Sequence, residues 1–145
     1  MDASPILVVE DDDLVRSFLC RALAGVAGDV DACATGEDAL RAAGRRRFGV
    51  ILLDGLLPDI LGIELAQRLI DHPNGSRSGI CFVSGSLRHP FAMREGISAL
   101  PKPLRLRELL DAAGLLLTWS RASGSTSSAA RLAALNVLRA DLLVS

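Results

Sequence analysis

Apolar residues gather in short continuous runs that alternate with segments of wider apolar spacing. Three runs, at residues 6–9, 48–53 and 80–83, contain no charged side chain and are rich in branched residues. Runs of this length and composition are typical of strands that are buried on both faces of a parallel sheet. The middle run ends at Asp54. We therefore expect Asp54 at the carboxyl end of a central strand, where open α/β sheets place their ligands.

Between these runs, apolar residues recur at intervals of three and four, which is the spacing of an amphipathic helix. Two shorter, mixed segments suit edge strands. The expected helices are residues 14–26, 35–46, 63–70 and 104–117, and the expected edge strands are residues 30–34 and 97–100. The alternation of strand and helix predicts an α/β fold with right-handed crossovers. We expect a doubly wound parallel sheet of five strands in the flavodoxin-like order 2-1-3-4-5.

The end of the chain departs from this alternation. Residues 122–128 have the composition of a flexible linker, and residues 129–144 show a helical apolar face. Its leucines are Leu132, Leu135, Leu138 and Leu142. The sequence thus predicts a main domain over residues 1–121 and a C-terminal helical extension over residues 129–145. The chain's own core, a second copy or a partner protein could cover the apolar face, and the spacing favours a second copy or a partner, including a homodimer through this helix. The alternative is a frayed extension with no role.

Composition narrows the function classes. The chain has 145 residues, which suits one domain, and its net charge of -1 gives no basis for direct binding to nucleic acid. No apolar run approaches the roughly 20 residues that span a bilayer, so we expect no membrane association and a cytoplasmic protein. The three cysteines form no CxxC pair and are interpreted as small buried hydrophobic residues.

Carboxylates follow the first and third strands. Glu10 and Asp11 come directly after residues 6–9, and Asp54 ends the third strand. These strands are neighbours in the expected order, so the three carboxylates converge at one edge of the sheet. Carboxylates in a small space repel one another, and burial makes each harder to ionise, unless a cation is present. The arrangement predicts a site for a hard divalent ion, Mg²⁺ or Mn²⁺.

Two further groups complete a possible phosphoryl-transfer site. Ser84 follows the fourth strand, and Lys102 follows the fifth and is the single lysine beside fifteen arginines. A compact ammonium suits a phosphate oxygen. A carboxylate nucleophile, a metal, a hydroxyl and a lysine are the components of phosphoryl transfer by positioning and charge stabilisation.

Four motifs carry a family resemblance over about residues 5–119. Residues 6–12, 50–62, 83–85 and 102–103, in this order and spacing, resemble the receiver domain of bacterial two-component response regulators. The resemblance implies that Asp54 accepts a phosphoryl group from a histidine kinase or a histidine phosphotransfer protein. It also implies that Glu10, Asp11, Asp54 and the backbone carbonyl of Leu56 bind the metal, and that Ser84 and Lys102 hold phosphoryl oxygens. Signalling would pass through contacts with a downstream protein, and the domain itself would not be an enzyme beyond its own phosphorylation and dephosphorylation.

The sequence departs from the resembled family in two places. Ala99 occupies the position three residues before the lysine, where an aromatic residue usually stands as a switch. Residues 84–102, broken by Pro90, look short for a full helix followed by a strand. These departures favour, as one alternative, a degenerate receiver that acts as an interaction module without switching.

A second alternative comes from residues 11–15, which fit the DxDx[TV] pattern of haloacid-dehalogenase-like phosphatases. In that interpretation Asp11 is the nucleophile, and Asp54 is incidental. A second acidic pair would have to complete the metal site, and Glu108 and Asp111 are the residues available, inside an expected helix.

Overall fold

A computed structural model describes residues 4–122 and 127–143 of the chain. The predicted linker at residues 122–128 lies largely outside the described residues, as do both ends of the chain. The strands are β1 (Ile6–Val9), β2 (Val30–Cys33), β3 (Val50–Asp54), β4 (Gly79–Ser84), β5 (Phe91–Arg94) and β6 (Ile97–Pro101). The helices are α1 (Asp13–Leu23), α2 (Gly36–Arg45), α3 (Gly62–Asp71), α4 (Leu106–Ala122) and α5 (Ser128–Leu143).

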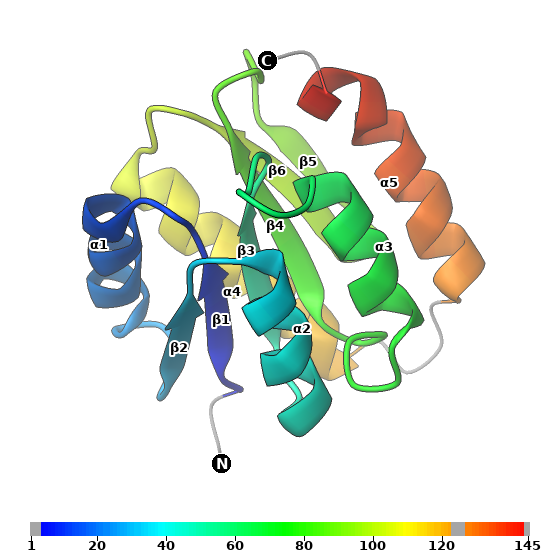
Figure 1. Cartoon of the computed structure of the whole chain (residues 1–145), viewed down its shortest axis with the longest axis horizontal. Coiled ribbons are helices and arrows are strands. Elements are labelled where there is room, and N and C mark those ends of the chain that lie inside the picture. Colours follow the sequence, from blue (N-terminus) through cyan, green and yellow to red (C-terminus); the bar gives the residue numbers. More distant parts are fainter. Residues whose placement is uncertain (1–3, 123–126, 144–145) are drawn as a thin grey trace.

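The strands form one sheet in the order β2-β1-β3-β4-β6-β5 (Figure 1). Neighbouring strands from β2 to β6 pair in parallel, which confirms the doubly wound flavodoxin-like fold. The prediction of five strands was wrong by one, because β5 pairs antiparallel with β6 and forms the edge. Glu95 and Gly96 connect the two strands with φ angles of 53° and 73°. Two left-handed residues make the tight turn of a hairpin, and the pair Glu-Gly is not among its usual sequence signals.

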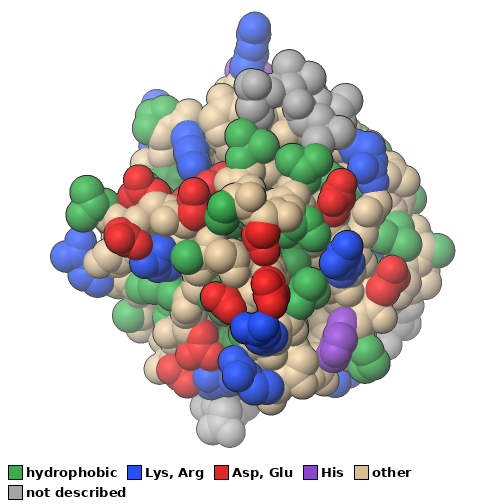
Figure 2. Space-filling view, viewed as in Figure 1, with side chains coloured by type: hydrophobic (Ala, Val, Ile, Leu, Met, Phe, Trp, Pro, Cys, Tyr) green, Lys and Arg blue, Asp and Glu red, His purple; other side chains and the backbone are tan. Residues whose placement is uncertain are grey.

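Helices cover both faces of the sheet. On one face, α1 and α4 pack over side chains of β1, β3 and β4 that include Val8, Leu52 and Val83. On the other face lie α2, α3 and α5, over side chains that include Leu53 and Phe82 (Figure 1). No helix in the described part of the chain is both long and apolar enough to span a membrane. The face seen in Figure 2 carries acidic and basic side chains interspersed, in keeping with the small net charge.

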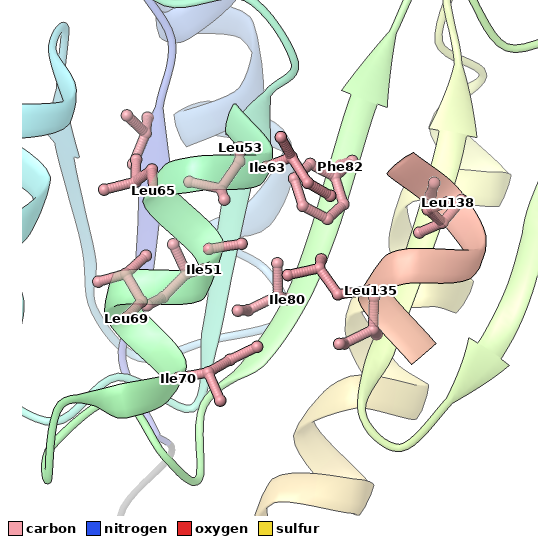
Figure 3. Close-up of a cluster of buried hydrophobic side chains, with 14 of the residues drawn as sticks. Ile51, Leu53, Ile63, Leu65, Leu69, Ile70, Ile80, Phe82, Leu135 and Leu138 are labelled. Atoms are coloured by element: carbon pink, nitrogen blue, oxygen red, sulfur yellow. The ribbon is translucent and has the colours of Figure 1, made fainter. Parts of the chain in front are cut away.

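Helix α5 packs on its own domain beside α3 and against β5 and β6. Leu135, Leu138 and Leu142 are buried in the same cluster as Ile80 and Phe82 of β4 (Figure 3). The prediction that a second copy or a partner covers this face was therefore wrong. The hairpin β5–β6 explains the difference: it replaces a crossover helix between β4 and β6, so this part of the sheet needs another apolar cover.

A buried arginine fixes the first half of α5. The guanidinium of Arg131 donates to the carbonyl oxygens of Ser76 at 2.8 Å, Glu95 at 3.0 Å, and Ser78 and Gly96 at 2.6 Å and 3.3 Å. It also lies 4.5 Å from the centre of the Trp119 ring. Burial lowers the pKa of Arg131 to about 10, so the side chain is still charged at neutral pH. The carbonyl oxygens and the aromatic face compensate for its loss of hydration.

Candidate functional site

Three carboxylates meet at the carboxyl ends of β1 and β3. The strands pair in parallel with Val9 opposite Leu53, so the residues that follow them reach the same edge of the sheet. Glu10, Asp11 and Asp54 each offer an oxygen, and these oxygens lie within 4.8 Å of one another. Glu10 is buried, Asp54 is partly buried and Asp11 is exposed. The cluster therefore opens to solvent at Asp11.

Lys102 is the basic partner of this cluster. Its Nζ lies 3.7 Å from a carboxylate oxygen of Glu10 and 3.6 Å from one of Asp54. Burial raises the pKa of Glu10 to about 7, and the nearby Asp54 carboxylate acts in the same direction. The backbone N–H of Asp12, which donates to Glu10 at 3.1 Å, and the Lys102 ammonium oppose that rise. One ammonium beside three carboxylates leaves an excess of negative charge that a divalent cation would balance.

Arg16 positions the acidic loop, a role that sequence reasoning missed. Its Nη1 donates to the backbone carbonyl of Glu10 at 2.9 Å, and its other terminal nitrogen pairs with Asp13. Asp12 accepts from the backbone N–H of Val15 at 2.9 Å and caps α1. The position of Arg16 contains the signal, because it lies in the first turn of α1, where helix side chains point back toward the N-terminus and so toward the loop before the helix.

The loop after Asp54 folds back onto the start of α3. The backbone N–H of Leu56 donates to the carboxylate of Asp54 at 3.2 Å, so the Leu56 backbone lies beside the predicted metal site. Gly62 donates its N–H to the carbonyl oxygen of Gly55 at 3.0 Å. A Cβ atom at Gly62 would lie 2.6 Å from the carbonyl oxygen of Asp54. Only glycine lets α3 begin this close to the loop.

Ser84 ends β4 next to this loop. Asp54 pairs with Val83 in register, and Ser84 follows it at the same edge of the sheet. The Ser84 hydroxyl lies 2.8 Å from the hydroxyl of Ser86 and accepts from the Ser86 backbone N–H at 3.2 Å. The backbone N–H of Lys102 donates to the Ser84 carbonyl at 3.0 Å, which joins the two phosphoryl-binding candidates. Ser86 itself was not predicted.

Ala99 lies away from these polar groups, inside the sheet. It pairs with Phe82 on β4 and with Phe91 on β5, and its methyl group is fully buried in the cluster that contains Leu138. A methyl group has no alternative rotamer. The predicted absence of an aromatic switch at this position therefore leaves β6 with no side chain here that can turn between inward and outward orientations.

Comparison with known proteins decides the family. The profile of the response regulator receiver domain matches residues 6–113, which span all six strands and the first part of α4. The chain belongs to the response regulator receiver domain family. Receiver domains are generally signalling modules of two-component systems and not enzymes. This membership argues against the phosphatase alternative with Asp11 as the nucleophile.

Curated relatives of this receiver match over part of their length. The chain is 38% identical over 72 residues to the response regulator GacA of Pseudomonas viridiflava, covering 48% of this chain and 34% of that protein. It is 31% identical over 70 residues to the transcriptional regulatory protein SrrA of Staphylococcus aureus, covering 48% of this chain and 29% of that protein. The chain thus matches about a third of the length of these relatives.

Solved receiver structures match this chain over almost their whole length. A putative response regulator from Chloroflexus aurantiacus is 26% identical with a TM-score of 0.67, and the match covers 81% of this chain and 99% of that one. The receiver domain of the sensor histidine kinase PA1611 from Pseudomonas aeruginosa, which has a magnesium ion coordinated in its active-site cleft, is 27% identical with a TM-score of 0.67. That match covers 83% of this chain and 99% of the other. Helix α5 lies beyond the residues that the family profile matches.

Proposed function

We propose that Asp54 accepts a phosphoryl group from the histidine of a kinase or a phosphotransfer protein. The observation that carries this proposal is the group of three carboxylates within 4.8 Å of one another, with the Lys102 ammonium 3.6 Å from Asp54. In the transfer, a carboxylate oxygen of Asp54 attacks phosphorus. The P–O bond forms as the P–N bond breaks, and the imidazole leaves with the bonding electron pair.

The other site residues take positioning roles in this proposal. Glu10, Asp11 and Asp54, with the Leu56 backbone carbonyl, would hold Mg²⁺, and Mn²⁺ has similar oxygen preferences. When bound, the ion neutralises charge on the phosphoryl oxygens. Lys102 pairs with one phosphoryl oxygen, and the Ser84 hydroxyl donates to another. The convergence of these residues at one edge of the sheet supports these roles.

The remaining assignments are also proposals. We expect phosphotransfer to take place in the cytoplasm, and the output to be a contact with a protein partner and not direct nucleic-acid binding. The phosphoacceptor unit is assigned to residues 1–121, and the C-terminal extension at 129–145 serves it as a cover through α5. A non-switching interaction module is the second candidate, and the buried Ala99 methyl group is the observation that favours it.

Mass spectrometry after incubation with acetyl phosphate and Mg²⁺ tests the phosphoacceptor. One phosphoryl group should be added, and it should be absent in Asp54→Asn and after chelation of the metal. Asp11→Asn should weaken labelling because it removes a metal ligand. Asp71→Asn, which changes an exposed aspartate at the end of α3, is the matched control and should label normally. An adduct on Asp11 that persists in Asp54→Asn would refute the proposal.

A further inference from the structure

The last turn of α5 lies beside the candidate phosphorylation site. The carbonyl oxygen of Asp141 accepts a hydrogen bond of 2.6 Å from the Ser86 hydroxyl. A Cβ atom built at Gly55, the residue after Asp54, would lie 3.9 Å from a methyl carbon of Leu142 and 3.4 Å from the Ser84 hydroxyl. One short stretch of backbone therefore contacts both Ser84 and the end of the helix.

The directions of the serine hydrogen bonds follow from their partners. A carbonyl oxygen only accepts, so the single hydroxyl proton of Ser86 points to Asp141. The 2.8 Å bond between the two hydroxyls must then use the proton of Ser84. Ser84 donates to Ser86, and Ser86 donates to the helix. The chain Ser84–Ser86–Asp141 thus occupies the one proton that Ser84 has.

A phosphoryl group on Asp54 competes for that proton. Its oxygens are acceptors, so Ser84 can hold one only by turning its hydroxyl proton away from Ser86. Ser86 then loses the donor to its own oxygen, while the Ser84 oxygen still accepts from the Ser86 backbone N–H. Hydrogen bonds in a chain strengthen one another, so the remaining bond from Ser86 to Asp141 also weakens.

The two ends of α5 differ in their polar contacts, although Leu138 and Leu142 pack its end in the core. Near its start, Arg131 donates to four carbonyl oxygens and lies on the Trp119 ring. Near its end, among the residues that the structure describes, the side-chain hydrogen bond that joins the helix to the loop after β4 is the one from Ser86. An open pocket of about 430 Å³, lined by residues 86–91 together with Leu138 and Asp141, borders this end. A change at Ser86 should therefore move the last turns of the helix and leave its start in place.

We propose that the end of α5, residues 138–143, is the element that responds to phosphorylation, and that Ser86 is the positioning residue that couples it to Asp54. The inference rests on the proposed phosphoacceptor function. In the unphosphorylated chain, the helix end is held down through Ser86. In the phosphorylated chain, Ser84 binds the phosphoryl group, and the helix end is held less firmly to the loop, while Arg131 keeps the start of the helix in place.

Amide hydrogen exchange of the full chain, with and without acetyl phosphate and Mg²⁺, tests this coupling. Phosphorylation should speed exchange at residues 138–143 roughly two- to fivefold, as expected when the Ser86–Asp141 hydrogen bond is weakened and not lost, and leave residues 128–134 unchanged. In Ser86→Ala, exchange at 138–143 should already be fast, and phosphorylation should add little. Ser120→Ala, which removes a 2.8 Å bond from a serine to the Arg77 carbonyl, is the matched control and should respond like the wild type.

The phosphoryl mass, measured on the same samples, distinguishes a failure of the coupling from a failure of the phosphoacceptor function. Full labelling of Asp54 without any change at residues 138–143 overturns the coupling and leaves the phosphoacceptor function standing. A wild-type response in Ser86→Ala overturns the role of Ser86. No labelling of Asp54 refutes the proposed function, and the coupling fails with it.

Discussion

Glu10 should make the stability of the metal-free protein fall as the pH rises. Its carboxyl group is 2% exposed, and burial raises its pKa from 4.5 to about 7. Between these two values the folded chain keeps a proton that the unfolded chain has lost. Stability falls with pH wherever the folded state binds more protons, so the loss develops from about pH 4.5 and is complete above the folded pKa of about 7.

The size of this effect follows from the shift. Each pKa unit corresponds to about 1.4 kcal/mol of differential interaction. Integrated from pH 5 to pH 8, the shift costs the wild type about 2.5 kcal/mol of unfolding free energy. Glu10→Gln has no proton to lose at this position. Urea unfolding in EDTA at both pH values should therefore show the variant gaining about 2–3 kcal/mol on the wild type as the pH rises.

All other titratable groups are common to both proteins and cancel in the comparison. Glu64→Gln, which changes an exposed glutamate at the start of α3, is the control and should track the wild type. If Glu10→Gln and the wild type differ by the same amount at pH 5 and pH 8, the buried carboxyl group ionises normally, and the electrostatic reasoning for the site is wrong.

Two further predictions test the scaffold of the site. Arg131→Met should lower the unfolding free energy by about 3 kcal/mol, since it leaves buried carbonyl oxygens without a donor. Urea unfolding measures this change. A loss below about 1 kcal/mol would contradict the anchoring role of Arg131. Gly62→Ala should destabilise the fold by about 1–3 kcal/mol and slow labelling of Asp54, because its Cβ would meet the Asp54 carbonyl oxygen at 2.6 Å. Gly114→Ala, where the Cβ meets nothing within 4 Å, is the control and should be neutral or stabilising in both assays.

The parts of the fold that sequence predicts well are those in which local pattern and tertiary environment agree. The apolar runs at β1, β3 and β4 are buried on both faces, so composition alone identifies them. Their order along the chain then places Glu10, Asp11 and Asp54 together. The caps at Asp12 and Thr35 are also local, because each side chain accepts from a backbone N–H three residues later.

The parts that were missed depend on contacts between distant segments. The pattern of α5 shows an apolar face but not which surface covers it. Arg131 lies on the same apolar stripe as Leu135, Leu138 and Leu142, at helical spacing. A single charged residue on such a stripe is a signal of a buried anchor. The prediction began the stripe at Leu132 and so overlooked this signal. Ser86 gave no signal, since its role comes from a bond to Asp141, 55 residues away.

The replaced connection between β4 and β6 restricts how this receiver can transmit a change at Asp54. A short hairpin stands where the expected fold has a crossover helix, and Ala99 offers no side chain that can change orientation. Among the described residues next to Asp54, Ser84 has a hydroxyl that can turn toward a phosphoryl group, and its present partner leads through Ser86 to Asp141. Helix α5 covers the face that the hairpin leaves open. Under the coupling proposed through Ser86, the same packing places the end of the helix where a phosphorylated Asp54 could loosen it. A receiver that signals in this way would present its output at the end of α5, beside the phosphorylated aspartate, and not on the face of β6.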